Sequence, residues 1–208
     1  MNHTPTRLLD VCERLLCQVD SVDELTVRRL ATAAGVTPSS VSYHFGSQER
    51  LIVATAERVY RRLNQERMSL LSQAVQRRFP SPPELEEVIA ALVGPSVRWS
   101  LEPTSKYRVL AHFNSMSQRS KEPEIYRAII EGVEHHKAFM AYLRQLAPWL
   151  DDAAIGWRMS CALGIRSQVT RNRMRNEVLT DHAIDFSDPD EVIGRIVEVV
   201  APMFRRES

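Results

Sequence analysis

The fold of this chain is set by the stretch LTVRRLATAAGVTPSSVSYHFGSQERL, residues 25–51. Thr26 is predicted to cap a short helix whose apolar residues recur every three or four positions, the spacing of a buried helical face. Gly35 predicts the end of that helix, because glycine adopts left-handed backbone conformations at little cost. Thr37 and Pro38 have the order of a cap and a first-turn proline, which opens a second helix. Two short helices joined by a tight glycine turn are typical of a helix-turn-helix, whose second helix enters the major groove of DNA.

The second of these helices is polar on one side, while Val41 and Phe45 are predicted to face inward. Side chains that contact DNA are predicted at Thr26, Thr37, Ser39, Ser40, Tyr43, His44 and Gln48. Thr26, Tyr43 and Gln48 are expected to bond phosphates, contacts that fix the register of a protein on DNA without reading its sequence. The other four are expected to reach base edges or phosphates. The alternative is that Tyr43 and His44 only pack the small domain.

A family pattern runs through the same stretch as Thr26-Val27, Leu30-Ala31, Ala34-Gly35-Val36-Thr37 and Tyr43-His44-Phe45-Gly46-Ser47, followed by Gln48 and Glu49. In these residues the chain resembles the DNA-binding segment of the TetR family of bacterial transcriptional regulators. One position departs from the pattern, since the family usually has lysine where this chain has Gln48. The resemblance implies an N-terminal three-helix domain, joined by a long helix to a helical body that binds a ligand and dimerises.

The rest of the chain is predicted to be helical, so the fold class is all-α. A first helix is predicted over residues 5–19, and a long helix is predicted to follow the cap Ser47 and to run to about Arg78. Four arginines of the long helix are predicted to be exposed: Arg58, Arg61, Arg62 and Arg67. Helix breaks are predicted at Gly94-Pro95, Glu102-Pro103, Glu122-Pro123, Ala147-Pro148 and residues 180–188, and Asp188-Pro189 is a strong helix start.

These breaks predict three parts of the chain. Residues 1–50 form the helix-turn-helix domain, residues 51–79 the connecting helix, and residues 80–208 the effector-binding and dimerisation domain. The prolines at positions 80, 82 and 83 interrupt the chain at the second boundary.

Composition and charge place the chain among ordinary globular proteins. It has 208 residues, 25% of them charged and 44% hydrophobic, and no apolar run of transmembrane length, so a cytoplasmic protein without membrane contact is expected. Residues 1–78 carry eleven arginines against eight acidic residues, and the net charge of the whole chain is +1. DNA binding therefore has to be argued from the motif and not from the summed field. Cys12, Cys17 and Cys161 are too few for a disulfide framework or a zinc site, and the first two are predicted to fill core positions.

Two helices are predicted to form the interface of a homodimer. In residues 152–172, Gly156, Ser160 and Gly164 recur every four residues and would let another helix approach closely. The last helix, residues 189–201, would contribute Val192, Ile196 and Val200. The resemblance implies that the final two helices of two subunits form a four-helix bundle, and two reading helices about 34 Å apart suit successive major grooves. The alternative is that both helices pack only within their own chain.

An effector pocket is predicted from aromatic, methionine and histidine side chains, which suit a medium-sized, partly apolar ligand. These are Trp99, His112, Phe113, Met116, Tyr126, His136, Phe139 and Trp157. Core packing is the alternative for each. His135 and His136 are adjacent and diverge by about 100° on a helix, so no metal site is predicted, and no cofactor. The basic run Arg166, Arg171, Arg173 and Arg175 fits either a helix C-terminus in solvent or an anionic effector such as an acyl-coenzyme A thioester.

The leading hypothesis is a sequence-specific transcriptional regulator that is no enzyme. It is expected to be a dimeric repressor, released from a near-palindromic operator when a small molecule binds. One alternative is an architectural DNA-binding or adaptor protein without an inducer. The other is an all-helical enzyme that uses His112 or the His135–His136 pair for acid-base chemistry, although no nucleophile elbow, phosphate loop or carboxylate pair accompanies these histidines.

Overall fold

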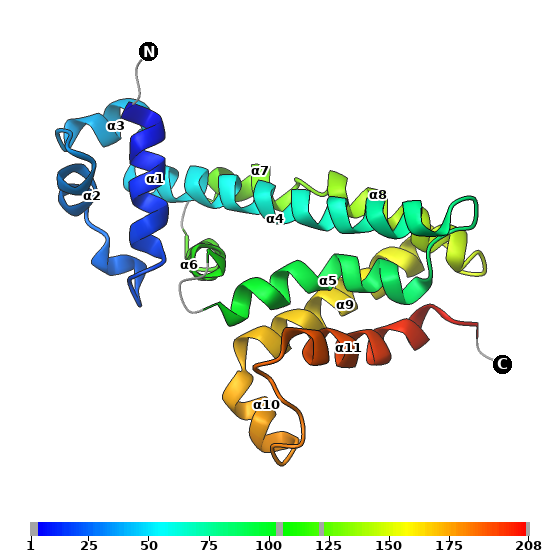
Figure 1. Ribbon diagram of the computed structural model, residues 1–208. Coiled ribbons are helices and arrows are strands. Elements are labelled where there is room, and N and C mark those ends of the chain that lie inside the picture. The colour runs from blue at the N-terminus through cyan, green and yellow to red at the C-terminus, as the bar shows by residue number, and fades with distance from the viewer. Residues whose placement is uncertain (1–3, 103–105, 121–122, 207–208) are drawn as a thin grey trace. The chain divides into compact units, whose positions relative to one another are not determined.

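The computed structural model describes residues 4–102, 106–120 and 123–206, which contain helices and no strand (Figure 1). The all-α prediction is therefore confirmed. The chain divides into two compact units. The first consists of Met1–Arg62 with Pro103–Gly132, and the second of Leu63–Glu102 with Val133–Ser208.

The first unit contains the predicted three-helix domain. Its helices are α1 (Thr4–Leu16), α2 (Val27–Ala34), α3 (Ser39–Phe45), the start of α4 (Gln48–Arg78), α6 (Tyr107–Ser117) and α7 (Arg127–Ile130), with short 3₁₀ turns at Val22–Glu24 and Pro123–Tyr126. Leu30, Ala31 and Ala34 of α2 are buried, as their spacing predicted, and so is Val41 of α3. In α1 the buried residues are Leu8, Val11, Cys12, Leu15 and Leu16. The core of this unit thus positions the two reading helices.

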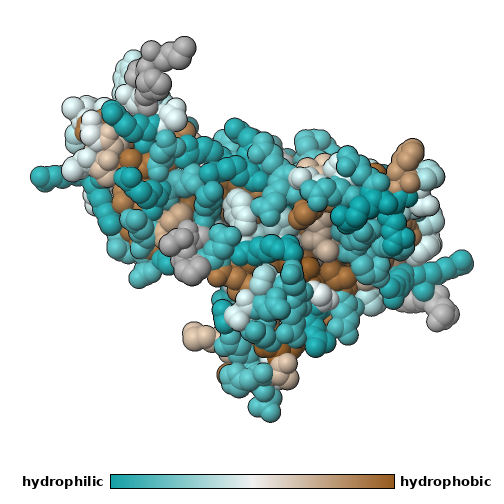
Figure 2. Space-filling model, viewed as in Figure 1, coloured by the Kyte–Doolittle hydropathy of each residue, from teal (hydrophilic) through white to brown (hydrophobic). Residues whose placement is uncertain are grey.

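The second unit is a bundle built on one apolar core. Its helices are the rest of α4, α5 (Leu85–Leu101), α8 (Glu134–Leu146), α9 (Asp152–Arg171), α10 (Arg173–Leu179) and α11 (Pro189–Val200), followed by a 3₁₀ turn at Ala201–Phe204. Apolar side chains of α5, α8, α9 and α11 make up the core. In Figure 2, brown hydrophobic residues gather over the region where α5, α9 and α11 run, and the side chains around them are mainly hydrophilic.

Most of the predicted helix ends are confirmed. α4 ends at Arg78, α5 at Leu101 and α8 at Leu146, and a loop follows α10. Asp188 caps α11 with Pro189 in its first turn. The predictions at positions 103 and 122 touch residues outside the described ranges.

The break predicted at Gly94-Pro95 is wrong, because α5 runs through Pro95. The steric conflict that proline imposes on the residue before it involves that residue's Cβ, which Gly94 lacks. All residues from Ala91 to Val97 are buried, so packing on both sides of the proline holds the helix together. Tertiary packing here overrides the local signal.

The compact units cut the chain differently from the three predicted parts. The break after α4 lies where the prolines indicated, but residues 103–132, with α6 and α7, belong to the same unit as the reading helices. The predicted functional division of 1–50, 51–79 and 80–208 stays a prediction.

Candidate functional site

The reading helices begin and end where local chemistry dictates. The Thr26 side chain accepts a hydrogen bond from the Arg29 backbone N–H at 3.1 Å, which satisfies one of the unpaired donors at the start of α2. Gly35 has φ +60° and ends that helix in the left-handed conformation, as predicted. Thr26 therefore holds the start of α2, and its hydroxyl proton remains available for a phosphate.

Hydroxyl groups cluster at the start of α3. The Thr37 hydroxyl lies 2.9 Å from that of Ser39 and 3.1 Å from that of Ser40. Thr37 and Ser39 are exposed and Ser40 is half-buried, while Val41 is fully buried and holds the helix down. The cluster presents several donors and acceptors to the solvent from one short segment, which suits contact with base edges or phosphates.

Tyr43 and His44 lie in the second half of α3, one turn after Ser39 and Ser40. The Tyr43 side chain is 84% exposed, and its ring meets that of His44 edge-on with centroids 4.9 Å apart. An aromatic side chain left this far in water contributes little to the core of the small domain. This exposure argues against the alternative that Tyr43 only packs the domain. His44 is half-buried, so its side chain meets both the domain and the solvent.

Gln48 makes an internal contact that the sequence did not predict. Its side-chain nitrogen donates to the backbone carbonyl of Leu25, which ties the first turn of α4 to the residue before the Thr26 cap. A primary amide carries two N–H groups, so one remains for the predicted phosphate contact. Sequence reasoning also overlooked Arg28 and Arg50, which are exposed near the two helices. Both arginines lie within the stretch of residues 25–51, and their positive charge was the available signal.

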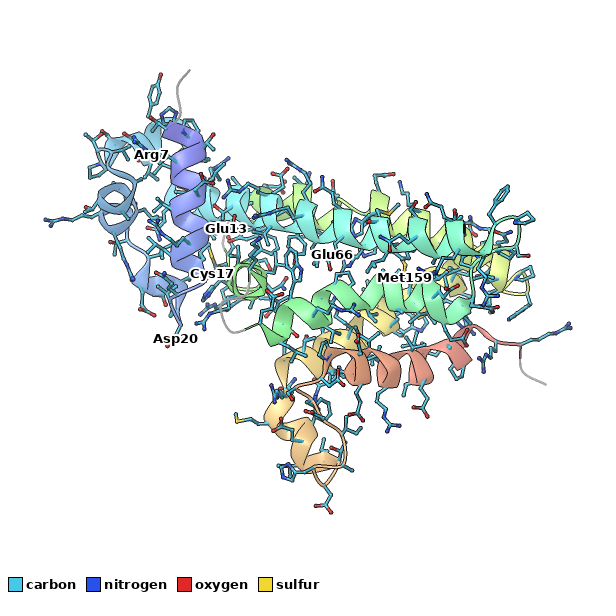
Figure 3. The ribbon with its side chains drawn as sticks, in the orientation of Figure 1. Arg7, Glu13, Cys17, Asp20, Glu66 and Met159 are labelled. Carbon is cyan, nitrogen blue, oxygen red and sulfur yellow. The ribbon has the colours of Figure 1, made fainter. Side chains whose placement is uncertain are left out.

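Polar contacts from α6 hold the far end of α1. The Arg108 guanidinium donates to the Val19 carbonyl and to the Asp20 carboxylate, both at 2.7 Å, and His112 Nε2 lies 3.2 Å from the same carbonyl. His112 was predicted in the effector pocket, and the structure instead gives it a partner at the end of the α1 segment. Figure 3 labels Glu13 in the last turn of α1, and Cys17 and Asp20 in the segment that follows it toward this contact.

A second contact holds the start of α4. The Tyr126 hydroxyl donates to Glu49 Oε1 at 2.5 Å, and Ser120 donates to the same oxygen at 2.9 Å. Tyr126 is 1% exposed, and its ring adjoins that of Phe113. Burial and the Glu49 carboxylate raise the pKa of Tyr126 well above its usual value, so the phenol stays protonated and donates. Phe113 and Tyr126, two of the predicted effector residues, therefore pack in the unit that contains the reading helices.

A cleft of about 460 Å³ lies beside α1 and is lined by Asp10, Glu13, Arg14, Cys17, Gln18, Arg58, Arg62 and Lys106. Arg58 pairs with Asp10 at 2.6 Å and with Glu13 at 2.8 Å, and Arg62 pairs with Glu13 at 2.5 Å. Both arginines are therefore partly covered, and the prediction that they are exposed is wrong because α1 supplies carboxylates. Burial raises the pKa of the Cys17 thiol and raises that of Cys12 to about 12, so neither is a ready thiolate.

The second unit holds polar groups in its interior. Arg67, predicted to be exposed, is only 4% exposed, and its guanidinium donates to Ser96 at 2.7 Å and to Asn64 at 2.9 Å. The Trp99 indole donates to Glu66 at 2.9 Å, and Figure 3 shows Glu66 on the side of α4 that meets α5. The prediction for Arg67 failed because a single arginine in a polar stretch gives no sign of the helix that covers it.

The eight predicted effector residues fall in both units. His112, Phe113, Met116 and Tyr126 belong to the first unit, and Trp99, His136, Phe139 and Trp157 to the second. Phe139 is fully buried in the apolar core, and His136 lies one turn before it. Trp157 is 71% exposed and lines a surface groove with Trp149. Within the second unit, Trp99, His136 and Phe139 are therefore turned toward the interior, and Trp157 is not.

The predicted dimer residues separate into two groups. Ser160 and Gly164 of α9 are exposed and Gly156 is partly exposed, so this stripe is open to a second helix. The three α11 residues Val192, Ile196 and Val200 are at most 4% exposed and already lie in the core of their own chain. The solvent side of α11 instead carries Gly194, Arg195 and Val199, and the last of these is 59% exposed.

The described residues contain neither a metal-binding cluster nor a membrane-spanning helix. No group of three or more histidine, cysteine, aspartate or glutamate side chains among them is arranged to hold a metal ion. In the same ranges, no helix is long and apolar enough to cross a membrane.

Comparison with known families identifies both halves of the molecule. Residues 90–203 match the family model described as "Tetracyclin repressor-like, C-terminal domain", a match that spans more than half of the chain. Residues 13–55 match the model for "Bacterial regulatory proteins, tetR family". The chain belongs to the TetR family. It is therefore a DNA-binding transcriptional regulator with a ligand-binding C-terminal domain, as the helix-turn-helix pattern predicted.

Solved structures share the fold of this TetR-family regulator. The multidrug-binding protein EbrR, complexed with imidazole, is 20% identical with a TM-score of 0.55, over 98% of this chain and 96% of that one. The fatty acid degradation regulator FadR from Bacillus halodurans is 14% identical with a TM-score of 0.61, over 100% and 99%. NalD, the secondary repressor of the MexAB-OprM multidrug efflux pump in Pseudomonas aeruginosa, is 20% identical with a TM-score of 0.53, over 98% and 96%.

At these identities the likeness concerns the TetR fold and leaves the ligand open. No curated protein gives a significant match to the sequence. The family consists of transcriptional regulators, which is the class that the motif predicted.

Proposed function

We propose that this TetR-family regulator is a homodimeric repressor that binds a near-palindromic operator and leaves it when a small molecule binds the second unit. The observation that carries the proposal is the surface of α3. There, the exposed Tyr43 ring and the hydroxyl cluster around Thr37 project from a helix held down by Val41. Such an arrangement suits a recognition helix, because exposed hydroxyl groups can bond base edges and phosphates in a groove.

Each predicted contact has a proposed task. Tyr43, Gln48 and Thr26 bond phosphates and set the register, while Thr37, Ser39, Ser40 and His44 meet base edges. Arg28 and Arg50, both exposed, add cationic phosphate contacts. Hydroxyls discriminate between bases less sharply than a bidentate arginine does, so we expect an operator with a few strongly preferred positions per half-site.

Dimerisation follows from the geometry of DNA. One reading helix covers only a half-site, and two copies related by a twofold axis engage successive major grooves about 34 Å apart. The exposed small-residue stripe at Ser160 and Gly164 is the proposed contact surface, together with Val199 on the solvent side of α11. Because the proposed target is DNA, we expect the protein to act in the cytoplasm.

Effector release requires coupling between the units. A coupling free energy of about 1–3 kcal/mol changes operator occupancy roughly 5- to 150-fold. A small shift in the contacts that hold the helix-turn-helix domain is therefore sufficient. We propose that two contacts transmit this shift. Arg108 of α6 bonds Val19, which follows α1, and Tyr126 bonds Glu49 at the start of α4.

The test is selection of the purified full chain against a random DNA library at near-physiological salt, followed by sequencing of the bound pool. Enrichment of a near-palindrome with half-sites one helical turn apart is the expected result. Tyr43→Ala serves as the matched negative variant, since its side chain is exposed and its loss leaves the fold intact. Absence of an enriched motif, or equal enrichment by the variant, would reject the proposed reading surface and favour an architectural or adaptor role.

A further inference from the structure

Three helices of the second unit direct nitrogen-bearing side chains toward the same interior. Arg67 on α4 lies four residues from both Leu63 and Leu71, which are 1% and 2% exposed. Arg166 on α9 lies four residues after Ala162, which is 1% exposed, and His136 on α8 lies three residues before the fully buried Phe139. Residues three or four apart share one face of a helix, so all three side chains follow core-facing stripes.

The polar atoms of this cluster are hidden from water. The Arg67 guanidinium is buried and bonds Ser96, a fully buried residue of α5. His136 Nε2 and Arg166 Nε are both inaccessible to solvent, and neither has a hydrogen-bond partner in the described structure. Burying a polar nitrogen without a partner costs about 1–3 kcal/mol, which is tolerated where a ligand later supplies the acceptor.

The electrostatic environment of the cluster is positive. The charged groups that act on His136 are the guanidiniums of Arg67 and Arg166 and the neighbouring His135 ring. Together with burial they lower the pKa of His136 to about 3, so the imidazole is neutral at physiological pH. A negative charge placed among these groups would relieve their mutual repulsion and give His136 and Arg166 a hydrogen-bond partner.

We propose that the effector of this regulator is an organic anion whose carboxylate or phosphate group is bound between Arg67, His136 and Arg166. The inference rests on the proposed function, since it names the ligand class for that effector. Guanidinium groups offer paired N–H donors that match carboxylate and phosphate oxygens. The apolar part of the ligand lies toward Phe139 and Met140, which continue the same side of α8 into the core. His136 and Arg166 are half-buried as whole residues, so one edge of the cluster is reached from the surface of the unit.

The experiment compares anions with neutral compounds of the same shape on the full chain. Thermal unfolding is measured with decanoate against decanamide, phenylacetate against phenylacetamide, and phenyl phosphate against phenol, and the dissociation constants of the stabilising compounds follow by calorimetry. We expect at least one anion of the panel to stabilise the protein where its neutral partner does not. Arg166→Met should weaken that binding by about tenfold or more, because it removes a charge-assisted hydrogen bond. Arg171→Met is the matched control, since it removes an exposed charge from the same helix and should leave the affinity unchanged.

Three results would overturn the inference: neutral compounds that stabilise as strongly as their anions, an Arg166→Met protein that keeps the preference for anions, or no stabilisation by any anion. Should Arg166→Met fail to fold, His136→Gln replaces it, since the amide keeps a donor while losing the ring. Operator binding is measured on the same preparations. A protein that selects an operator but ignores anions has the proposed function with another ligand class, whereas one that binds anions without selecting DNA retains this site and loses the proposed function.

Discussion

The two units of this regulator use polar side chains in opposite ways. In the first, Tyr43 is 84% exposed and the Thr37 hydroxyl cluster faces the solvent. In the second, Arg67 is 4% exposed, and His136 Nε2 and Arg166 Nε are hidden from water. One unit thus keeps its binding groups hydrated until a large polyanion replaces the water. The other keeps them dehydrated, where each interaction with a small ligand is stronger.

This difference has a consequence for how mutations act. Fully exposed groups of the reading surface, such as the Tyr43 side chain, contribute little to folding, so their loss affects mainly binding. Groups in the interior of the second unit contribute to both, because removing them changes packing as well as charge. Stability and DNA binding measured side by side therefore separate the two regions.

The largest expected effect comes from the core of the second unit. Phe139→Ala empties a fully buried position and should lower the free energy of unfolding by about 3–5 kcal/mol. Urea denaturation followed by circular dichroism measures the change. Phe139→Leu is the control and should lose much less. A loss below about 1 kcal/mol for the alanine variant would mean that this interior collapses easily and is less rigid than the packing indicates.

The next effect is a dependence of stability on pH. Because the pKa of His136 is lowered to about 3, the unfolded chain binds a proton near pH 6.5 that the folded chain does not. The stability contributed by neutral His136 is fully present above pH 6.5 and falls as the pH decreases, by at most about 1.4 kcal/mol per pH unit.

Denaturation midpoints at several pH values between 7 and about 5 test this sign. In His136→Gln the decline should be shallower than in the wild type. Equal slopes in the wild type and His136→Gln would show that the ring is not buried among cations in solution.

A smaller effect on stability is expected at Gly35, in the turn between the two reading helices. Gly35 has φ +60°, and an added Cβ would meet nothing within 4 Å, so Gly35→Ala introduces backbone strain without a clash. The variant should be less stable by about 1–2 kcal/mol. Thr32→Ala is the control, because that residue is exposed and helical in the same short helix. Its stability should rise or stay the same, and a loss as large as that at Gly35 would contradict the strain argument.

The smallest effect on folding belongs to Tyr43. Tyr43→Phe should change the free energy of unfolding by less than about 0.5 kcal/mol, since the hydroxyl lies in water. The same variant should weaken operator binding roughly tenfold and equally across operator sequences, because a phosphate contact carries no sequence information. Fluorescence anisotropy with the selected operator measures this. Weakening confined to one base position would reassign Tyr43 to base reading.

The sequence predicted the reading surface well because its signals are local. A threonine cap, a left-handed glycine and a serine cap before α4 each act within four residues, and all three are present in the structure. Gln48 shows the limit of this reasoning. Its bond to Leu25 joins positions 23 residues apart, and only the folded domain brings them together.

Polar residues whose partners lie far away in the chain were predicted poorly in both units, for the same reason. Arg67 looked like a solvated residue of a long helix, and His112 and Tyr126 looked like pocket residues. The structure buries the first, and gives the other two partners at Val19 and Glu49. None of these contacts joins residues that are close in the chain, so neither periodicity nor composition reports them.

By itself, the sequence determined the helical class, the caps and turns of the reader, and the resemblance to one family of regulators, since each depends on interactions between near neighbours. Only the tertiary structure decided which charged groups are buried, which helices support the reader, and that Arg67, His136 and Arg166 turn toward one interior. Those features depend on contacts between segments as far as 99 residues apart, from position 67 to position 166, which have no signature in the local order of residues.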